Sequence, residues 1–122
     1  MQIPDTPLFV KTHDFNVWLI RHTQRFPKSL RYTLTQRLEN LALEFEECLW
    51  MANAVRGRAR TEWLTVADGK LLSLRGVFRY TLDFELLGSN QVKFALESLD
   101  ELGRLLGAWL KGTDRKAPAL PA

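Results

Sequence analysis

The residues of this sequence best suited to chemistry are basic, and they are separated along the chain from the acidic ones. Five basic residues and no acidic one lie between positions 21 and 37: Arg21, Arg25, Lys28, Arg31 and Arg37. An entirely acidic run follows (Glu39, Glu44, Glu46, Glu47), and then a second basic run (Arg56, Arg58, Arg60). A local concentration of Lys and Arg attracts phosphate even when the formal net charge is only +3. The pattern favours a nucleic-acid partner.

Helix dipoles rank these basic residues by how far helix structure alone explains them. Three would end a predicted helix, where a cation is favoured by roughly 0.3–1 kcal/mol: Arg21, Arg25 and Arg56. Four would open or precede a helix, where a cation is disfavoured: Lys28, Arg31, Arg58 and Arg60. A further pair, Arg75 and Arg79, would repel each other across one helical turn. We predict a nucleic-acid-binding set in this order: Lys28, Arg31, Arg58, Arg60, Arg75, Arg79, Arg21 and Arg25.

Residue types also indicate how such binding would work. Eleven arginines against six lysines favour forked contacts to phosphate over diffuse charge. Because the bulky aromatic residues fall mostly in apolar seams, base stacking is not indicated. We expect binding that is led by the nucleic-acid backbone and only weakly specific for sequence.

Catalysis and metal binding are poorly supported. His13 and His22 lie nine residues apart, so one helix face cannot hold both as ligands. Cys48 falls on a helical seam with no base nearby in the sequence and is predicted to be an inert core thiol. The glutamates lack the Glu-x-x-His spacing of di-iron bundles, and no glycine-rich phosphate loop is present. We expect no enzymatic activity, no cofactor and no metal.

Bulk properties predict one intracellular domain. At 122 residues the chain is long enough to bury a core without disulfides or bound metals. A single cysteine excludes an internal disulfide, which suits the cytoplasm. No apolar run approaches the ~20 residues that cross a bilayer, and the first residues lack signal-peptide features. A membrane partner is not expected.

Apolar periodicity predicts four helices, over roughly 8–25, 29–56, 61–87 and 91–111. Pro7 suits a first turn, Thr61 is predicted to cap the third helix, and Ser89 or Asn90 the fourth. No segment alternates in the manner of a strand. The chain is therefore predicted to be all-α, an antiparallel up-down-up-down four-helix bundle over 1–111 with a flexible tail over 112–122.

The apolar stripes are wider than one core requires, which favours a homo-oligomer. The surplus residues lie on the second and fourth helices: Leu43, Leu49, Trp50, Met51, Leu96, Leu105 and Leu110. Gly103 and Gly107 have a spacing that permits close packing of helices. We expect this packing to occur within one chain rather than between subunits.

Several short segments resemble one known family in their order and spacing. They are Pro7-Leu8-Phe9, Asp14-Phe15, Trp18-Leu19, Phe26-Pro27-Lys28-Ser29, Gln36-Arg37-Leu38-Glu39, Ala52-Asn53 and 102–111. Together they resemble the accessory variability determinant (Avd) of diversity-generating retroelements. The resemblance implies a ring-like pentamer of four-helix bundles. It also implies binding to template RNA or cDNA and to the element's reverse transcriptase during mutagenic retrohoming.

Two other readings stay open at this point. Avd is similar to the four-helix proteins encoded in intervening sequences of 23S ribosomal RNA genes, which implies an RNA-binding protein that acts without a transcriptase. A homo-oligomeric adaptor whose arginines meet an acidic protein surface also fits the charge pattern. The sequence leaves undecided the oligomer number, RNA against DNA, the target gene, and which basic residues meet which partner.

Overall fold

A computed structural model describes residues 6–116, with side chains described for residues 6–113. Its helices are α1 (Pro7–Thr23), α2 (Gln36–Ala54), α3 (Gly57–Asp83) and α4 (Ser89–Lys116). Two short turns, the 3₁₀ turn η1 (Lys28–Leu30) and the π turn η2 (Arg31–Thr35), lead into α2. No strand occurs within residues 6–116. The prediction of an all-α four-helix bundle is confirmed.

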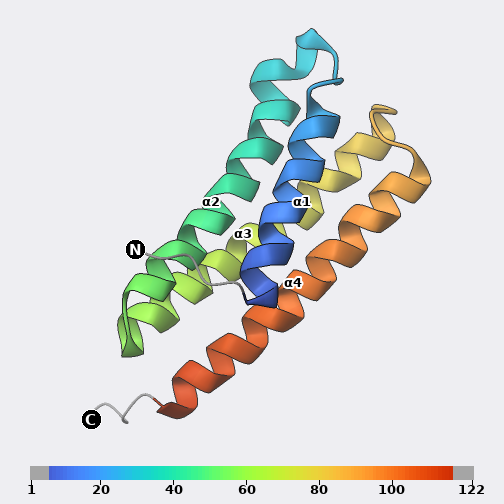
Figure 1. Ribbon diagram of the computed structural model, residues 1–122. Coiled ribbons are helices and arrows are strands. Elements are labelled where there is room, and N and C mark those ends of the chain that lie inside the picture. Colours follow the sequence, from blue (N-terminus) through green and yellow to red (C-terminus); the bar gives the residue numbers. More distant parts are fainter. Residues whose placement is uncertain (1–5, 117–122) are drawn as a thin grey trace.

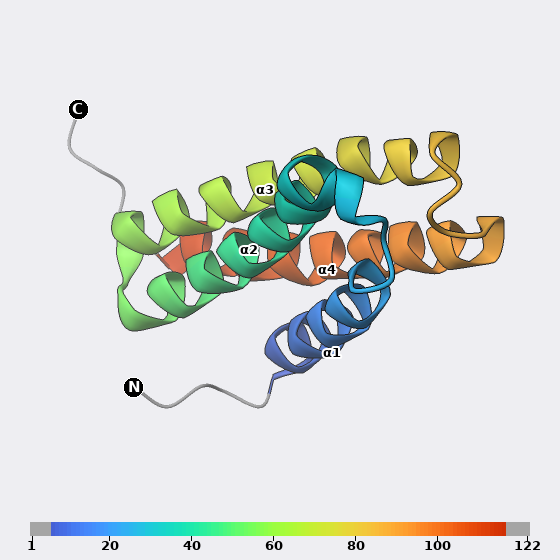
Figure 2. The ribbon, with the colours of Figure 1, turned by 90° about the horizontal axis from the view of Figure 1, so that it is seen from above.

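Each of the four helices packs against two others. Each packs against its neighbour in the chain, and α1 also packs against α4, so α1 and α3 lie diagonally opposite (Figure 2). The α1–α2 and α3–α4 connections lie at one end of the bundle and the α2–α3 connection at the other (Figure 1). We call these the loop end (residues 24–35 and 84–88) and the turn end (residues 55–60).

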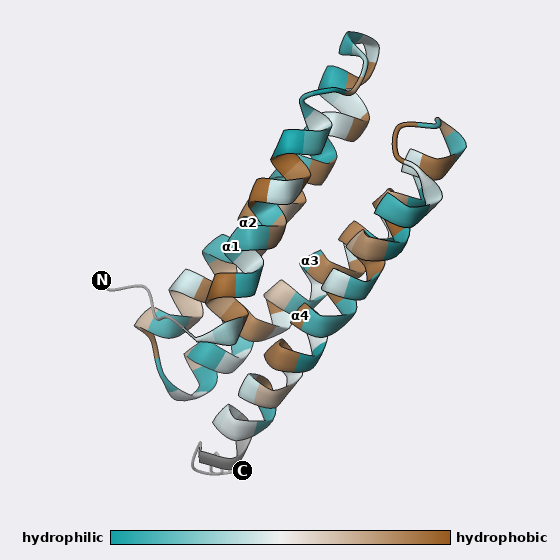
Figure 3. Ribbon diagram, turned by 45° about the vertical axis from the view of Figure 1, so that its right-hand side comes forward, coloured by the Kyte–Doolittle hydropathy of each residue, from teal (hydrophilic) through white to brown (hydrophobic). Residues whose placement is uncertain are grey.

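The core follows the predicted seams. In α3 five apolar residues spaced three and four apart are all buried: Leu64, Ala67, Leu71, Leu74 and Phe78. In α2 the apolar residues spaced three and four apart are buried from Leu38 to Ala52. Figure 3 shows hydrophobic and hydrophilic residues alternating along the helices. Apolar residues spaced three and four apart line one side of a helix, so this periodicity alone was sufficient to position the core.

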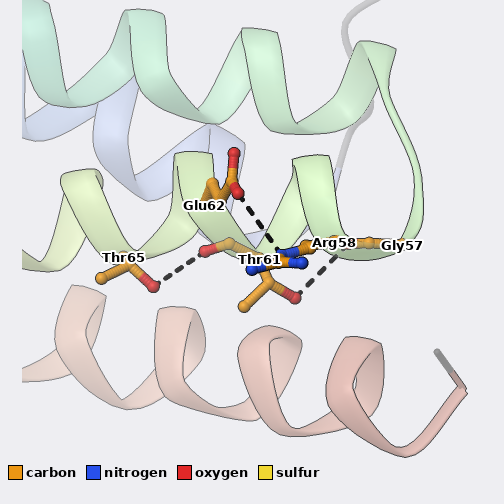
Figure 4. Close-up of polar contacts among 5 residues, drawn as sticks. All are labelled: Gly57, Arg58, Thr61, Glu62 and Thr65. Carbon is orange, nitrogen blue, oxygen red and sulfur yellow. Dashed lines mark hydrogen bonds and ion pairs between the residues drawn. The ribbon is translucent and has the colours of Figure 1, made fainter. Parts of the chain in front are cut away.

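The turn end differs from the prediction because α3 begins at Gly57, not at 61. Gly57 has a φ of 60°, a left-handed conformation that glycine adopts without strain, and so the chain reverses within two residues of α2. Thr61 therefore lies in the second turn of α3 and is not its N-cap. Its hydroxyl donates to the Gly57 carbonyl (3.4 Å), and the Thr65 hydroxyl donates to the Thr61 carbonyl (Figure 4).

At the loop end α3 stops four residues earlier than predicted, at Asp83. Glu85 takes a left-handed φ of 55°, and the Leu86 amide donates to the Thr81 carbonyl, which together make a Schellman-type helix end. The fourth helix begins at Ser89, two residues before the predicted start. The Gln91 side chain accepts a hydrogen bond from the Gly88 amide (2.9 Å), in place of a Ser89 or Asn90 cap.

The C-terminal end of α4 also differs from the prediction. Residues 112–116, predicted to belong to a flexible tail, continue the helix to Lys116. Residues 117–122 lie outside the described residues. Gly112 therefore does not end the helix, because a single glycine costs only about 1 kcal/mol relative to alanine.

Most of the expected surplus of apolar surface on α2 and α4 is absent. Leu49 is fully buried, and four more of the seven residues pack partly against the core: Trp50, Leu96, Leu105 and Leu110. Only Leu43 and Met51 are exposed. Gly103 has just two neighbours, Leu71 and Arg75, at 3.9 Å from a built Cβ, and Gly107 has none within 4 Å. Close packing through this glycine pair is therefore slight.

Among the helices of the described part of the chain, none is both long and apolar enough to cross a membrane.

Candidate nucleic-acid interface

The α1–α2 connection is anchored to the bundle on both sides. The Thr23 hydroxyl donates to Glu39 Oε2 (2.6 Å), which ties the last residue of α1 to the first turn of α2. Phe26 is buried in the core, and its amide donates to the Thr23 carbonyl (3.0 Å). Residues 24–35 are therefore placed by one buried aromatic ring and one strong hydrogen bond.

The eight predicted binding residues fall into two groups. Five carry exposed side chains and form no ion pair with any residue in the range 6–116: Arg21, Arg25, Lys28, Arg31 and Arg79. All five lie on the final turns of α1 or α3 or in the α1–α2 connection, so they gather toward the loop end. The other three engage partners within the chain.

The three engaged arginines lie nearer the turn end or the middle of α3. Arg58 pairs with Glu62 one turn on (3.6 Å), and both side chains are well exposed (Figure 4). Arg75 pairs with Asp100 of α4. Exposed ion pairs stabilise a fold by less than about 1 kcal/mol, but each pair neutralises the cation locally.

Arg60 has a structural role. Its Nε donates to two carbonyl oxygens at the end of α2, those of Ala52 (2.9 Å) and Val55 (3.0 Å). Its guanidinium lies 5.4 Å from the centre of the Trp109 ring, within cation–π range. Arg60 thus gives the Val55 carbonyl a donor and the Ala52 carbonyl, which also accepts from the Val55 amide (3.4 Å), a second one. It thereby closes the tight turn before α3.

Acidic residues confine the positive surface to one side of the loop end. Asp83, the last residue of α3, and Glu85, in the α3–α4 connection, are both exposed and repel phosphate there. On the α1–α2 side no acidic residue occurs between Asp14 and Glu39. The basic surface therefore comprises the end of α1, η1 and η2.

Four aromatic side chains are exposed, contrary to the reasoning that discounted base stacking: Tyr32, Tyr80, Phe84 and Phe94. The other nine are buried or packed against the core, as the sequence predicted. Tyr32 lies within the basic surface itself, two positions from both Leu30 and Leu34. Because position 32 lies outside the apolar periodicity, the sequence already indicated that the Tyr32 side chain would be exposed.

The single cysteine is buried, and the two histidines lie on α1, one exposed and one partly buried. Burial raises the pKa of the Cys48 thiol, which disfavours the reactive thiolate. His13 is exposed, and His22 Nδ1 lies 2.7 Å from the Trp18 carbonyl oxygen. A hydrogen bond from Lys11 lowers the pKa of the exposed Glu101 carboxyl. No cluster of three or more His, Cys, Asp or Glu side chains that could hold a metal occurs in the described part.

Comparison with known proteins bears on family and fold. Residues 8–113 match the model of a family described as bAvd-like. Among solved structures, the chain is similar to a protein of unknown function from the S23 ribosomal protein family of Bacteroides thetaiotaomicron. The TM-score is 0.77 at 12% identity, covering 85% of this chain and 95% of the other. At that identity the likeness concerns the fold alone. The curated proteins contain no match.

Proposed function

This chain belongs to the bAvd-like family, and from that membership we propose that it is a non-catalytic accessory protein of a diversity-generating retroelement. In this proposal it acts in the cytoplasm, holding template RNA or cDNA near the element's reverse transcriptase while the template is copied. The chemistry of copying belongs to the transcriptase. The accessory chain contributes phosphate-binding surface and a protein-binding surface.

One observation carries the nucleic-acid part of this proposal. Five cations at the loop end form no ion pair in the described part of the chain, although the molecule has acidic residues enough to neutralise them. Several unpaired cations on one surface make the local electrostatic potential positive, and this potential attracts a polyanion. Four of the five are arginines, whose planar fork contacts phosphate oxygens in pairs. Such contacts fix position without reading sequence.

A homo-oligomer would multiply this surface, and α3 offers the face best suited to assembly. The Leu72 residue of α3 is 71% exposed, and Val66 and Tyr80 of the same helix are also exposed. Gly69 and Gly76 have no neighbour within 4 Å of a built Cβ, which leaves room for close approach. We propose that this face contacts another copy in the ring-like assembly that the family resemblance implies. In solution, elution as a 14.1 kDa monomer at working concentration would refute the assembly.

The nucleic-acid proposal predicts affinity that falls steeply with salt for structured RNA or DNA. Lys28→Ala combined with Arg31→Ala removes two unpaired cations and should weaken binding to all sequences alike. Fluorescence anisotropy over a salt series would measure the affinity. The slope of log K against log salt should become less steep by about 1–2.

A charge-matched control separates a specific surface from net charge. Arg58→Ala combined with Arg75→Ala also removes two positive charges, but both of these cations already have partners. Binding by this control should stay close to that of the unmodified protein. Undetectable or salt-independent binding by the unmodified protein would overturn the proposal, and a salt-independent complex with an acidic protein would favour the adaptor function.

The retroelement part of the proposal is tested by genomic neighbourhood and by co-purification. A neighbouring reverse-transcriptase gene with an imperfect repeat pair, and recovery of that transcriptase with the tagged chain, would support it. A position within a ribosomal RNA operon would instead favour the alternative function, binding RNA without a transcriptase.

A further inference from the structure

Tyr32 is the most exposed large apolar side chain in the described part of the molecule, with 80% of its surface accessible. Its ring contacts no other aromatic ring, and its hydroxyl has no hydrogen-bond partner within residues 6–116. Leu30 and Leu34, two residues to either side, are half-buried. Tyr32 therefore points away from the core that its neighbours contact, and packing within the chain does not explain it.

The backbone beneath Tyr32 is irregular but hydrogen-bonded. The Leu30 amide donates to the Pro27 carbonyl (3.0 Å), and the Thr33 hydroxyl donates to the Leu30 carbonyl (3.3 Å). The π turn from Arg31 to Thr35 then passes into α2. π turns are rare and are found frequently at functional sites. These hydrogen bonds fix the backbone that carries the ring, so binding would have to order only the side chain.

Polar and cationic residues lie close to Tyr32 in the sequence. Arg31 is adjacent to Tyr32, while Lys28 and Gln36 lie four residues before and after it, and all three are exposed. Neither cation is paired, and no acid lies between residues 15 and 38. An exposed aromatic ring that follows two unpaired cations in one short segment matches the chemistry with which proteins hold single strands, whose bases stack while their phosphates meet Lys and Arg.

We propose that Tyr32 is a stacking platform for an unpaired base, and that the nucleic acid at the loop end is single-stranded. Lys28 and Arg31 contact the phosphates on either side of the stacked nucleotide. This proposal rests on the proposed function, because it requires those two cations to be phosphate contacts. It adds the class of nucleic acid and a residue that acts on bases rather than on the backbone.

Other exposed aromatic side chains fit this role less well. Phe84 is 57% exposed at the same end of the bundle, but Asp83 and Glu85 flank it and repel phosphate. The Phe94 ring already lies 5.0 Å from the Trp18 ring. Tyr80 lies on the α3 face assigned above to assembly. Phe84 therefore supplies a matched control, an exposed aromatic ring at the same end without the cations.

The experiment compares three probes of about 12 nucleotides. One is an unstructured single strand with ordinary bases, the second is its fully paired duplex, and the third is an abasic strand that keeps every phosphate. RNA and DNA versions are both used. Affinities are measured by fluorescence anisotropy at several salt concentrations for the full chain and for four variants: Tyr32→Ala, Tyr32→Phe, Phe84→Ala, and Lys28→Ala with Arg31→Ala.

We expect Tyr32→Ala to weaken binding of the ordinary single strand by about tenfold. It should leave the duplex, the abasic strand and the salt slope nearly unchanged, because only stacking is lost. Tyr32→Phe keeps a ring and should bind as the unmodified protein does, as should Phe84→Ala. The Lys28 and Arg31 double variant should weaken all three probes, because every probe has phosphates.

Two results separate failure of this inference from failure of the proposed function. Salt-dependent binding in which Tyr32→Ala affects all probes equally, or none, overturns the stacking role and leaves the proposed function standing. Intact nucleic-acid binding with lost capture of a protein partner also overturns it and assigns Tyr32 to that partner. Absence of salt-dependent binding to any probe refutes both proposals together.

Discussion

At the turn end of the bundle, an arginine and an aromatic ring lie against each other and hold the fold together. Arg60 lies over Trp109 while its Nε bonds the last carbonyls of α2. At the loop end, Arg31 and Tyr32 are also neighbours, but both face solvent and neither has a partner in the described residues. The same two residue types serve structure at one end and remain available for binding at the other.

This contrast shows that charge placement alone does not identify a binding residue. A cation is available to phosphate only if no carbonyl, carboxylate or aromatic face in the folded chain already holds it. At the turn end the partners of Arg60 lie within the chain, whereas five cations at the loop end have no ion-pair partner within residues 6–116. The following predictions test that difference, beginning with the largest expected effect.

Removing the buried anchor of the loop end should have the largest effect. Phe26→Ala deletes a core ring that is only 9% exposed and should lower the free energy of unfolding by about 3 kcal/mol. Phe26→Leu keeps most of the volume and should cost less than about 1.5 kcal/mol. Urea unfolding followed by circular dichroism measures both. Equal, small losses would mean that the loop end is not fixed by this ring.

At the turn end, Arg60→Ala should lower the free energy of unfolding by about 2 kcal/mol, because two carbonyls lose a charged donor. Arg58→Ala is the matched control two residues away, where only an exposed ion pair is lost. It should change stability by less than about 1 kcal/mol. If the two variants were equally stable, the capping role of Arg60 would be wrong.

The sequence was a good guide to the helices and their buried faces, because apolar periodicity reports the core directly. Helix ends were less predictable. The left-handed φ of Gly57 lets α3 start at once, so Thr61 lies inside the helix. Glu85 takes the same kind of conformation without being glycine, which composition does not reveal.

The availability of each cation was harder to predict, since it depends on contacts between distant residues. The helix-dipole argument favoured Arg60 for binding, whereas its partners are backbone carbonyls of the preceding helix. The partner of Arg75 is Asp100 on another helix, which no local rule identifies. Arg58 and Glu62 are four residues apart on α3, but the predicted helix start at 61 left Arg58 outside the helix and concealed this pair.

A strained position at the loop end offers a smaller, stabilising prediction. Glu85→Gly removes the steric strain of a side chain at φ 55° and should raise the free energy of unfolding by about 0.5–1 kcal/mol. Thermal unfolding followed by circular dichroism provides the measurement. Glu85→Gln, which keeps the strain and removes only the charge, should leave stability nearly unchanged. Similar gains in both variants would attribute the effect to charge instead.

The smallest expected effect is the most informative about the two ends. Lys28→Ala with Arg31→Ala should change the free energy of unfolding by less than about 0.5 kcal/mol, because neither side chain has an ion-pair partner within residues 6–116. Any change should favour the folded state at low salt, since removing two charges reduces the repulsion among the unpaired cations of the loop end. A measurable loss of stability would give both residues a structural role like that of Arg60. Stability that is kept while nucleic-acid affinity falls would mean that these cations are retained for a partner, because the fold does not need them.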